Sequence, residues 1–467
     1  MELKGLQEYT ESAVGEGKEF EEQLRRLVSV PSLSKEEKHR ADLRRVQEIM
    51  GDIAGGIGFE TWVSDDEFPI LVGKLQTNPN LPWLTIYNHM DVQPAEEEWE
   101  IPDPFDPVVR DGKIIGRGST DDKGPALTTL HAIRFLRSQD LPLPNIQLIY
   151  ETEEESGSSH FAGYLEKYRN RMEECESVLV SDTIFEGEHP ALSYKLRGSL
   201  DLVATLEYGN KEIHSGLYGG AVRNPVNVLN RAIAAAEDDR GNVIIPGFHA
   251  EVKELEGREL EEFHRVCSEF DVAAFRKAAE RPLTSDDPAE ILLRSLHQPT
   301  FEIFGYDHIH SGGDRPKSAV PCKVAVKLSV RTVAHQKPDH LREVIDVFLQ
   351  AKVREYLGHD DFTLTVEGEG PLPFVVDVDN PFIEQARLAC REGFGKDPLF
   401  VACGGTIGAL PPLQERFGAP IVLIAQSLLE DGYHEPNESF RFDQARGGVR
   451  TMAHYLSSIA ELRLKKA

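Results

Sequence analysis

The sequence predicts an α/β protein whose sheet domain is interrupted by an inserted α+β domain. Between about residues 60 and 190, and again after about residue 372, apolar strand-like runs alternate with helix-like segments, a pattern typical of a sheet with helices on both faces. In between, residues alternate in polarity, as half-exposed antiparallel strands do. With 467 residues the chain is also too long for one ordinary core. We therefore expect a first domain formed by residues 1–191 and 373–467, and a second domain formed by residues 192–372.

The first domain is expected to begin with helical structure. Phe20, Leu24 and Leu27 recur at helical spacing, and a proline ends the pattern. Short runs then predict strands at residues 83–87, 108–110, 113–115, 146–150 and 177–180. An Asp-Gly pair at residues 111–112 separates two of these strands and predicts a tight hairpin. A helix is expected over residues 124–137, where apolar side chains recur on one side.

The inserted domain is expected to combine antiparallel strands with helices. Alternating residues predict strands at residues 199–207, 323–330 and 362–366. Helices are expected at residues 225–236 and within the charged stretch 251–280. After the insertion, an uninterrupted apolar run predicts a buried strand at residues 420–425. A long amphipathic helix closes the chain, with apolar residues at positions 442, 445, 449, 452, 456 and 459.

The composition disfavours some classes of function. The formal net charge is −28, which argues against binding to nucleic acid or anionic membranes, because their phosphates would be repelled. The five cysteines are widely spaced and form no Cys-x-x-Cys pair, so a reducing compartment is the simplest expectation. The N-terminus lacks a signal peptide's apolar stretch, and no run of about eighteen apolar residues suggests a membrane span. We expect a cytoplasmic location.

Five acidic or imidazole motifs follow strand-like runs and carry the chemistry. They are His89-Met90-Asp91, Asp121-Asp122-Lys123-Gly124, Glu154-Glu155-Ser156-Gly157-Ser158, Ser181-Asp182-Thr183 and Gly432-Tyr433-His434-Glu435. Ligands bind outside the carboxyl ends of the strands in open α/β sheets, so these motifs are expected to converge. Together they supply two imidazoles and at least three carboxylates, which suffice for two divalent metals and one general base. This inventory predicts a metal-assisted hydrolase.

Each motif also has a structural explanation when it is taken alone. The carboxylate of Asp91 or Asp121 can cap a helix, and Asp182 and His434 can be ordinary loop residues. The acidic run at residues 151–155 can be a solvated loop. A phosphate-binding loop is a further alternative at residues 116–124, although the spacing differs from the Walker pattern and acids dominate the turn. Joint occurrence at strand ends favours the metal site.

The motifs resemble those of the di-zinc exopeptidases that include aminoacylase, carboxypeptidase G and carnosinase. The similarity is closest to the cytosolic non-specific dipeptidase, or carnosinase-like, branch, and extends from about residue 20 to the C-terminus. Its most specific parts are residues 116–124, 154–158, 214–220 and 431–438. The resemblance implies a di-zinc exopeptidase-like catalytic domain with an inserted lid and dimerisation domain.

The resemblance also implies a ligand set. His89 and Asp182 would hold one zinc, and Glu155 and His434 the other, with Asp121 bridging both. Two divalent metal ions per subunit are expected, zinc first, with manganese or cobalt as substitutes in an oxygen-rich site. A cis peptide bond is expected after the bridging aspartate.

The remaining roles come from the same resemblance. Asp91 would orient His89, and Glu154 would be the general base that activates a water between the metals. His214 would reach the partner subunit's cleft in a homodimer and stabilise the oxyanion; a structural histidine in a glycine turn is the alternative. The expected substrate-binding residues are Arg331, Gly405, Thr406 and Asn224. For these residues a strand end, a turn of positive φ and a helix cap are the alternatives.

The expected reaction is hydrolysis of a peptide bond in a dipeptide or short peptide with a free carboxylate. An N-acyl-amino-acid deacylase or desuccinylase of the same family is the nearest alternative, so the expected partners are a peptide or an N-acyl amino acid. A non-catalytic scaffold and a di-metal phosphoesterase are alternatives from other classes. Two departures from carnosinase-like sequences, at residues 367–371 and at Ala402-Cys403, bear on substrate choice and leave the predicted ligands intact.

Overall fold

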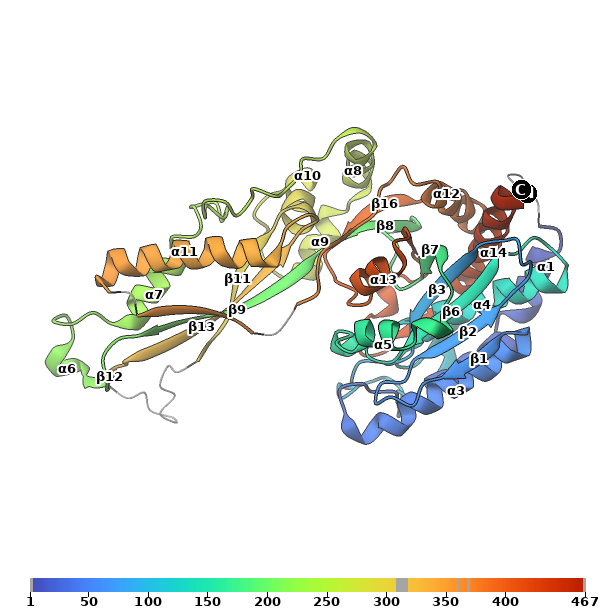
Figure 1. Cartoon of the computed structure of the whole chain (residues 1–467), viewed down its shortest axis with the longest axis horizontal. Helices are drawn as coiled ribbons and strands as arrows, with labels where there is room; N and C mark the ends of the chain where they lie inside the picture. Colours follow the sequence, from blue (N-terminus) through green and yellow to red (C-terminus); the bar gives the residue numbers. More distant parts are fainter. Residues whose placement is uncertain (1–2, 308–317, 360, 368–369, 465–467) are drawn as a thin grey trace.

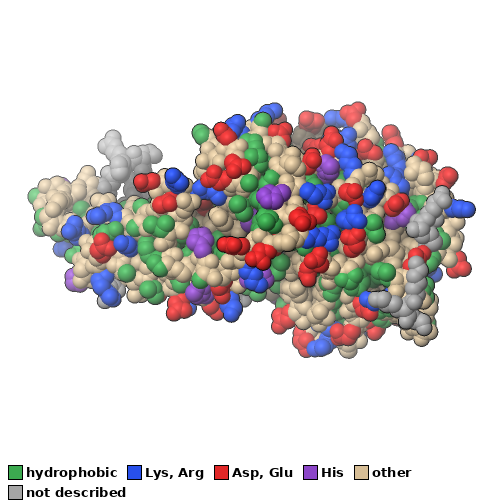
Figure 2. Space-filling model, turned by 90° about the horizontal axis from the view of Figure 1, so that it is seen from above, with side chains coloured by type: hydrophobic (Ala, Val, Ile, Leu, Met, Phe, Trp, Pro, Cys, Tyr) green, Lys and Arg blue, Asp and Glu red, His purple; other side chains and the backbone are tan. Residues whose placement is uncertain are grey.

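The computed structural model describes residues 3–307, 318–359, 361–367 and 370–464. The molecule has two lobes, one built around a large mixed sheet and the other around a smaller antiparallel sheet (Figure 1). This confirms the predicted α/β class with an α+β insertion. None of the helices described is both long enough and apolar enough to cross a lipid bilayer. Figure 2 shows side chains of both charge signs interspersed over one face of both lobes, as expected for a solvated surface.

The large sheet has nine strands within the described ranges. In spatial order they are β1 (Glu60–Val63), β2 (Leu71–Leu75), β6 (Asn145–Glu151), β3 (Trp83–His89), β7 (Cys175–Val180), β17 (Ile421–Ile424), β8 (Ala191–Leu196) and β15 (Phe374–Val375), while β16 (Leu399–Cys403) also pairs with β8. Strands β6, β3, β7 and β17 are parallel neighbours. Their carboxyl ends therefore meet at one edge. Strand β3 is buried at every position after Trp83, which explains its uninterrupted apolar run.

Helices cover both faces of this sheet (Figure 1). One group packs together along one face and consists of α1 (Leu6–Ala13), α2 (Glu19–Val28), α3 (Arg40–Ile57), α4 (Lys123–Ser138), α12 (Pro381–Phe394) and α14 (Phe442–Leu464). The other face carries α5 (Phe161–Lys167) and α13 (Leu410–Phe417). The predicted N-terminal helical segment is divided into α1 and α2, because Gly15 and Gly17 adopt positive φ angles of 154° and 68°.

Shorter elements complete the first lobe. A three-stranded sheet consists of β4 (Val108–Arg110), β5 (Lys113–Ile115) and β18 (Ser439–Arg441), and it contains the predicted Asp111-Gly112 hairpin. Single turns of 3-10 helix are η1 (Glu37–His39), η2 (Glu154–Ser156), η3 (Arg169–Arg171) and η5 (Leu429–Asp431). Strand β18 follows the His434 motif and pairs with β5, just before the Asp121 motif. This pairing brings two motifs together that lie more than 300 residues apart in the sequence.

The second lobe has a four-stranded antiparallel sheet in the part of the chain that is described. Its order is β11 (Thr300–Asp307), β13 (Lys323–Thr332), β9 (Gly198–Glu207) and β14 (Phe362–Val366). Helices α7 (Pro225–Ala234) and α11 (Pro338–Leu357) pack on one face of it around a separate hydrophobic core. The insertion also contains β10 (Ile213–His214), β12 (Ala319–Val320), α6 (Ser215–Tyr218) and α9 (Val272–Ala279). Its helices α8 (Gly257–Glu269) and α10 (Pro288–Leu292) and the π-helical turn η4 (Leu293–His297) instead pack together against strand β16 of the large sheet.

The chain passes between the two sheets at one narrow place. Strand β8 ends at Leu196 in the large sheet, and β9 begins at Gly198 in the small one. The returning chain lies alongside, since a Cβ atom on Gly198 would come within 2.5 Å of the Pro371 carbonyl oxygen. Only glycine allows the two passages to approach so closely. The division at residues 191/192 and 372/373 stays a prediction, and β8 lies wholly within the large sheet.

A buried histidine, His131 of α4, lies between α1 and α2, and its titration depends on how these helices pack. The His131 ring is buried, its Nδ1 lies 3.2 Å from Tyr9 Oη, and its Nε2 lies 3.0 Å from Gln23 Oε1. These partners fit a neutral ring that donates from Nε2 and accepts at Nδ1. Burial lowers the pKa of His131 to about 4, while Glu19 opposes the shift and Arg134 adds to it.

The first prediction concerns the pH dependence of stability. The folded pKa of about 4 lies below the ordinary value of 6.5, so this contribution to stability is present above pH 6.5 and is lost as the pH falls towards 4. The loss is on the order of 3 kcal/mol. Substitution H131Q removes it, and denaturant unfolding between pH 4 and 7 should show a shallower decline than the parent protein. The exposed-site variant H264Q should follow the parent curve, and identical curves for H131Q and the parent would contradict the assignment.

Candidate metal centre

The five predicted ligands reach one place from five segments of the first lobe. His89 is the last residue of β3, Glu155 lies in η2 after β6, and Asp182 follows β7. Because these three strands are parallel neighbours, their ends lie side by side at the edge of the sheet. Asp121 comes from the loop between β5 and α4, and His434 from the loop that follows η5. The structure therefore brings all five side chains together.

Their ligand atoms form two groups that share one carboxylate. Nε2 of His89 lies 2.9 Å from Asp121 Oδ1 and 3.8 Å from Asp182 Oδ2. Nε2 of His434 lies 3.1 Å from Asp121 Oδ2 and 3.2 Å from Glu155 Oε2. Within each group the ligand atoms lie within 4.8 Å of one another. The two oxygens of Asp121 thus face two different imidazoles, which is the arrangement a bridging carboxylate needs.

The electrostatics of the cluster fit a pair of cations. Burial and the neighbouring Asp121 raise the pKa of Asp182 to about 7. Contacts with the carboxylates of Asp121 and Glu155 raise the pKa of His434 to about 10. The first shift reflects burial and, beside it, repulsion among crowded carboxylates, whereas the second reflects the attraction of these carboxylates for positive charge. Nitrogen and oxygen donors in this number suit divalent zinc, manganese or cobalt, so the donor set fits the expected metals.

Asp91 supports both sides of the cluster. Its Oδ1 lies 3.4 Å from Nδ1 of His89, on the ring edge opposite the Nε2 that faces Asp121 and Asp182. Its two carboxylate oxygens also accept the backbone N–H groups of Glu154 (3.2 Å) and Glu155 (3.0 Å). The sequence suggested the first contact, whereas the second arises only because β3 and β6 are adjacent. Asp91 therefore fixes the η2 turn as well as the imidazole.

Glu154 lies beside the ligands without belonging to either group. It is half-buried in η2, directly before Glu155. Withdrawal from solvent raises the pKa of Glu154 well above its usual value, and the carboxylates of Asp182, Glu155 and Asp121 add to the rise. A carboxyl group with raised proton affinity next to a metal site is suited to accept and return a proton.

Comparison with known proteins shows what this arrangement belongs to. Residues 85–458 match the model of peptidase family M20/M25/M40. The chain belongs to this family. The M20 chain is 28% identical to human beta-Ala-His dipeptidase over 403 residues, which cover 84% of this chain and 78% of that protein. It is also 28% identical to the Cys-Gly metallodipeptidase DUG1 of Saccharomyces cerevisiae over 401 residues, covering 84% and 82%.

Solved structures agree with the sequence comparison. The dipeptidase Dug1p from Saccharomyces cerevisiae matches with a TM-score of 0.79 and 25% identity, over 98% of both chains. Human carnosine dipeptidase 1 matches with the same TM-score and identity, over 98% of this chain and 99% of that one. The resemblance to carnosinase-like enzymes is thus confirmed, as are a hydrolase of the peptidase type and the use of divalent metal.

The loop that carries Asp121 is strongly constrained in this M20 peptidase. The peptide bond between Asp121 and Asp122 is cis, as the resemblance implied. The buried Asp122 carboxylate accepts a 2.7 Å hydrogen bond from Asn88 Nδ2. The ammonium group of Lys123 is fully buried and donates to the Leu27 and Val30 carbonyl oxygens. Main-chain oxygens therefore hold the Lys123 ammonium group in the protein interior, away from any phosphate on the surface of the loop, which argues against the phosphate-loop alternative.

Three predicted residues lie in the second lobe: Arg331 at the end of β13, and His214 and Asn224, which are away from the metal centre. His214 is exposed and directly precedes α6, the helix that lies at the end of the molecule opposite the large sheet (Figure 1). Its Nδ1 accepts the Gly216 N–H at 3.0 Å. Asn224 caps α7 by accepting the Val226 N–H at 2.9 Å, which is the plainer of the two explanations considered for it. Neither His214 nor Asn224 joins the cluster within one chain.

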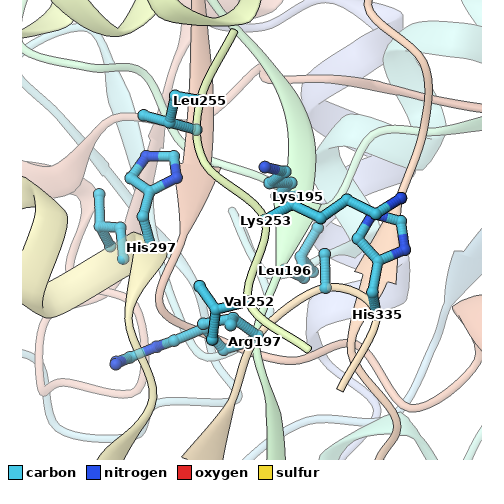
Figure 3. A pocket seen from close by; sticks show the side chains of 11 residues that line it. Lys195, Leu196, Arg197, Val252, Lys253, Leu255, His297 and His335 are labelled. Atoms are coloured by element: carbon cyan, nitrogen blue, oxygen red, sulfur yellow. The ribbon is translucent and has the colours of Figure 1, made fainter. Parts of the chain in front are cut away.

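Basic residues that the sequence did not single out gather where the lobes meet. Figure 3 shows a cavity lined by Lys195, Leu196, Arg197, Val252, Lys253, Leu255, His297 and His335, among others. Arg197 Nε lies 3.4 Å from the Gly404 carbonyl oxygen, and burial together with the charge of Arg331 lowers the pKa of Arg197 to about 10. In the described part of the chain neither arginine forms an ion pair.

The glycine turn after β16 connects this basic region to the metal centre. Burial raises the pKa of the Cys403 thiol; the Gly405 backbone N–H and the charge of Arg197 oppose the rise, and the charge of Asp182 adds to it. Gly405 is exposed and Thr406 half-buried directly after it. Gly405 does not adopt the positive φ of the alternative explanation. Of the divergent segment 367–371, residues 368–369 lie outside the described residues.

Proposed function

We propose that this M20 peptidase hydrolyses dipeptides or short peptides that carry a free carboxylate. The observation that carries the proposal is the pair of ligand groups that share Asp121, with Glu154 as a spare carboxylate beside them. The names of the human and yeast relatives, which denote dipeptidases, support the size of the substrate. A non-catalytic scaffold is disfavoured, because every predicted ligand and the predicted base are present.

The proposed metal ions are zinc, with manganese or cobalt able to replace them. His89 and Asp182 would hold one ion, Glu155 and His434 the other, and Asp121 both. When bound, the ions would polarise the scissile carbonyl and lower the pKa of a water between them. Glu154 would take a proton from the attacking water and deliver it to the nitrogen of the leaving amine.

The free carboxylate of the substrate is proposed to meet the arginines at the lobe junction. Arg331 and Arg197 lie close enough for their charges to interact, and neither has a carboxylate partner among the described residues. A planar guanidinium binds a carboxylate through two parallel hydrogen bonds. Gly405 and Thr406 would contact the same end of the substrate from the turn after β16. An N-acyl amino acid carries the same carboxylate, so this contact alone does not separate a peptidase from a deacylase.

The proposed assembly is a homodimer in which His214 of each subunit completes the site of the other. Strand β11 forms an edge of the small sheet, and its exposed side chains include Ile303 (45%), Phe304 (67%) and Tyr306 (44%). An apolar edge strand is a ready surface for pairing with a second copy. We further propose that residues 192–372 act as lid and dimerisation domain. A cytoplasmic location is proposed, supported by five cysteines that are all free.

The second prediction tests the reaction itself. Metal-loaded protein should hydrolyse unblocked dipeptides, lose this activity after complete chelation, and regain it when zinc, manganese or cobalt is added. Release of amino acids is measured across a matched panel of dipeptides and N-acetyl and N-succinyl amino acids with the same carboxyl-terminal residues. Preference for the acyl compounds would replace the proposal with a deacylase, and undiminished hydrolysis after chelation would exclude the metal mechanism.

The third prediction concerns the base. Substitution E154Q keeps the size of the side chain but removes its ability to accept a proton, so kcat should fall by about 10²- to 10⁴-fold. Metal content, measured by atomic emission, should stay at the parent value because Glu154 belongs to neither ligand group. The nearby exposed-site variant E435Q should retain its turnover. A normal kcat for E154Q would remove Glu154 as the base.

The fourth prediction concerns the shared site. Variants H214A and E154Q should each be nearly inactive as homodimers, yet their mixture should recover activity after subunit exchange. A random mixture places an intact Glu154 and the partner's intact histidine together in about a quarter of the sites. H249A, which alters another exposed histidine of the same lobe, should be active without mixing. With exchange verified by differently tagged subunits, absence of recovery would contradict the shared site.

A further inference from the structure

We infer that Glu438 is a positioning residue, whose carboxylate clasps the loop that carries Asp121 to the loop that carries His434. The inference rests on the proposed metal centre. Glu438 lies four residues after His434 and is itself not a member of either ligand group. It is almost completely buried, with 1% of its surface exposed. A buried carboxylate needs several donors to compensate for the loss of water, and here all of them come from one loop.

Four hydrogen bonds join the Glu438 carboxylate to residues 117–121. Oε2 accepts from Arg117 Nη1 at 3.0 Å and from the Gly118 N–H at 2.9 Å. Oε1 accepts from the Thr120 N–H at 3.0 Å and from the Asp121 N–H at 3.1 Å. Each oxygen therefore accepts two donors, and one of those donors is the backbone amide of the residue that faces both imidazoles.

Neighbouring contacts show that the two loops are held together on both sides of His434. The Glu438 carbonyl oxygen accepts the Gly116 N–H at 2.9 Å, which continues the pairing of β18 with β5. On the other side of the histidine, Asp431 Oδ2 accepts the Leu428 N–H at 2.8 Å and lies 3.4 Å from Thr120 Oγ1. His434 itself has a positive φ of 56° and is mostly exposed, so apart from the contacts of its Nε2 with Asp121 and Glu155 its position depends on these two loops.

The geometry requires a carboxylate rather than any hydrogen-bonding side chain. Glutamine of the same length offers one accepting oxygen and one amide nitrogen that donates. In E438Q, two of the four donors would therefore face a donor, and the buried Arg117 guanidinium would lose its charged partner at this position. Aspartate keeps both oxygens on a shorter stem and cannot reach all four donors at once. The set of four hydrogen bonds between residue 438 and residues 117–121 should accordingly be lost in E438Q and partly kept in E438D.

The consequence is expected in metal affinity, because the distance between Asp121 and His434 determines the second ligand group. Loss of residues that orient metal ligands typically weakens metal binding by about 10- to 100-fold. Apoprotein is titrated with cobalt, and binding is followed by calorimetry and by visible absorption of the bound ion. We expect E438Q to bind cobalt about 10- to 100-fold more weakly with an altered absorption spectrum, and E438D to show a smaller loss. Thermal unfolding of each apoprotein is recorded in parallel.

The matched control is E435Q, which makes the same charge change at an exposed position of the same loop and should bind cobalt within twofold of the parent. If E438Q binds cobalt with the affinity and the absorption spectrum of the parent, the inference is overturned. This holds even if the E438Q apoprotein unfolds at a lower temperature, because that result alone shows a purely structural role. If E438Q does not fold, unchanged binding by E438D overturns it instead. The variant D121N separates the two proposals. If D121N binds cobalt as the parent does, the metal centre itself is rejected. If D121N loses cobalt binding while E438Q binds normally, only the positioning role of Glu438 is rejected.

Discussion

Repulsion among carboxylates that are withdrawn from water is the constraint on which the rest of this site depends. Burial and the neighbouring carboxylates raise the pKa values of Glu154, Glu155 and Asp182, whereas contacts with the two imidazoles outweigh burial and lower the pKa of Asp121 alone. Like charges in a buried site are stable only when protons or cations compensate them. The fold holds these groups together at the ends of parallel strands, where backbone amides and Asp91 fix the turns. Such a site is organised for cations before any cation binds.

The large sheet places three of the five candidate ligands, and two loops place the other two. Strands β6, β3 and β7 deliver Glu155, His89 and Asp182 to one edge, and this follows from their parallel pairing alone. Asp121 and His434 come from loops, which have no such inherent register. Their placement depends on the pairing of β18 with β5 and on a buried network around the two loops. The site therefore depends both on the parallel strands of the sheet and on the buried hydrogen bonds that hold the two loops beside it.

Much of this arrangement could be predicted from the sequence because it depends on local pattern. The apolar run before His89 marks a strand end, and the Asp111-Gly112 pair marks a hairpin, so the edge of the sheet and its acidic motifs were predictable. The break at Gly15 and Gly17 was missed because the helical spacing of Phe20, Leu24 and Leu27, which follow the glycines, was extended to the whole N-terminal segment. Glu438 and Arg197 were missed for a different reason: their surroundings are created by segments distant in the chain. No local pattern distinguishes such a buried glutamate or arginine from an exposed one.

The narrow passage at Gly198 has a consequence for how the two lobes are related. Strands β8 and β15, which precede and follow the insertion, are antiparallel neighbours, with Leu196 opposite Phe374. Their facing ends have the geometry of an ordinary β-hairpin, in which a tight turn would suffice to join them. The smaller lobe thus occupies the place of a hairpin loop between β8 and β15, and the pairing of these two strands does not require it. In topological terms it can diverge in size and surface without altering the pairing of β8 with β15, provided that α8 and η4 keep their packing against β16.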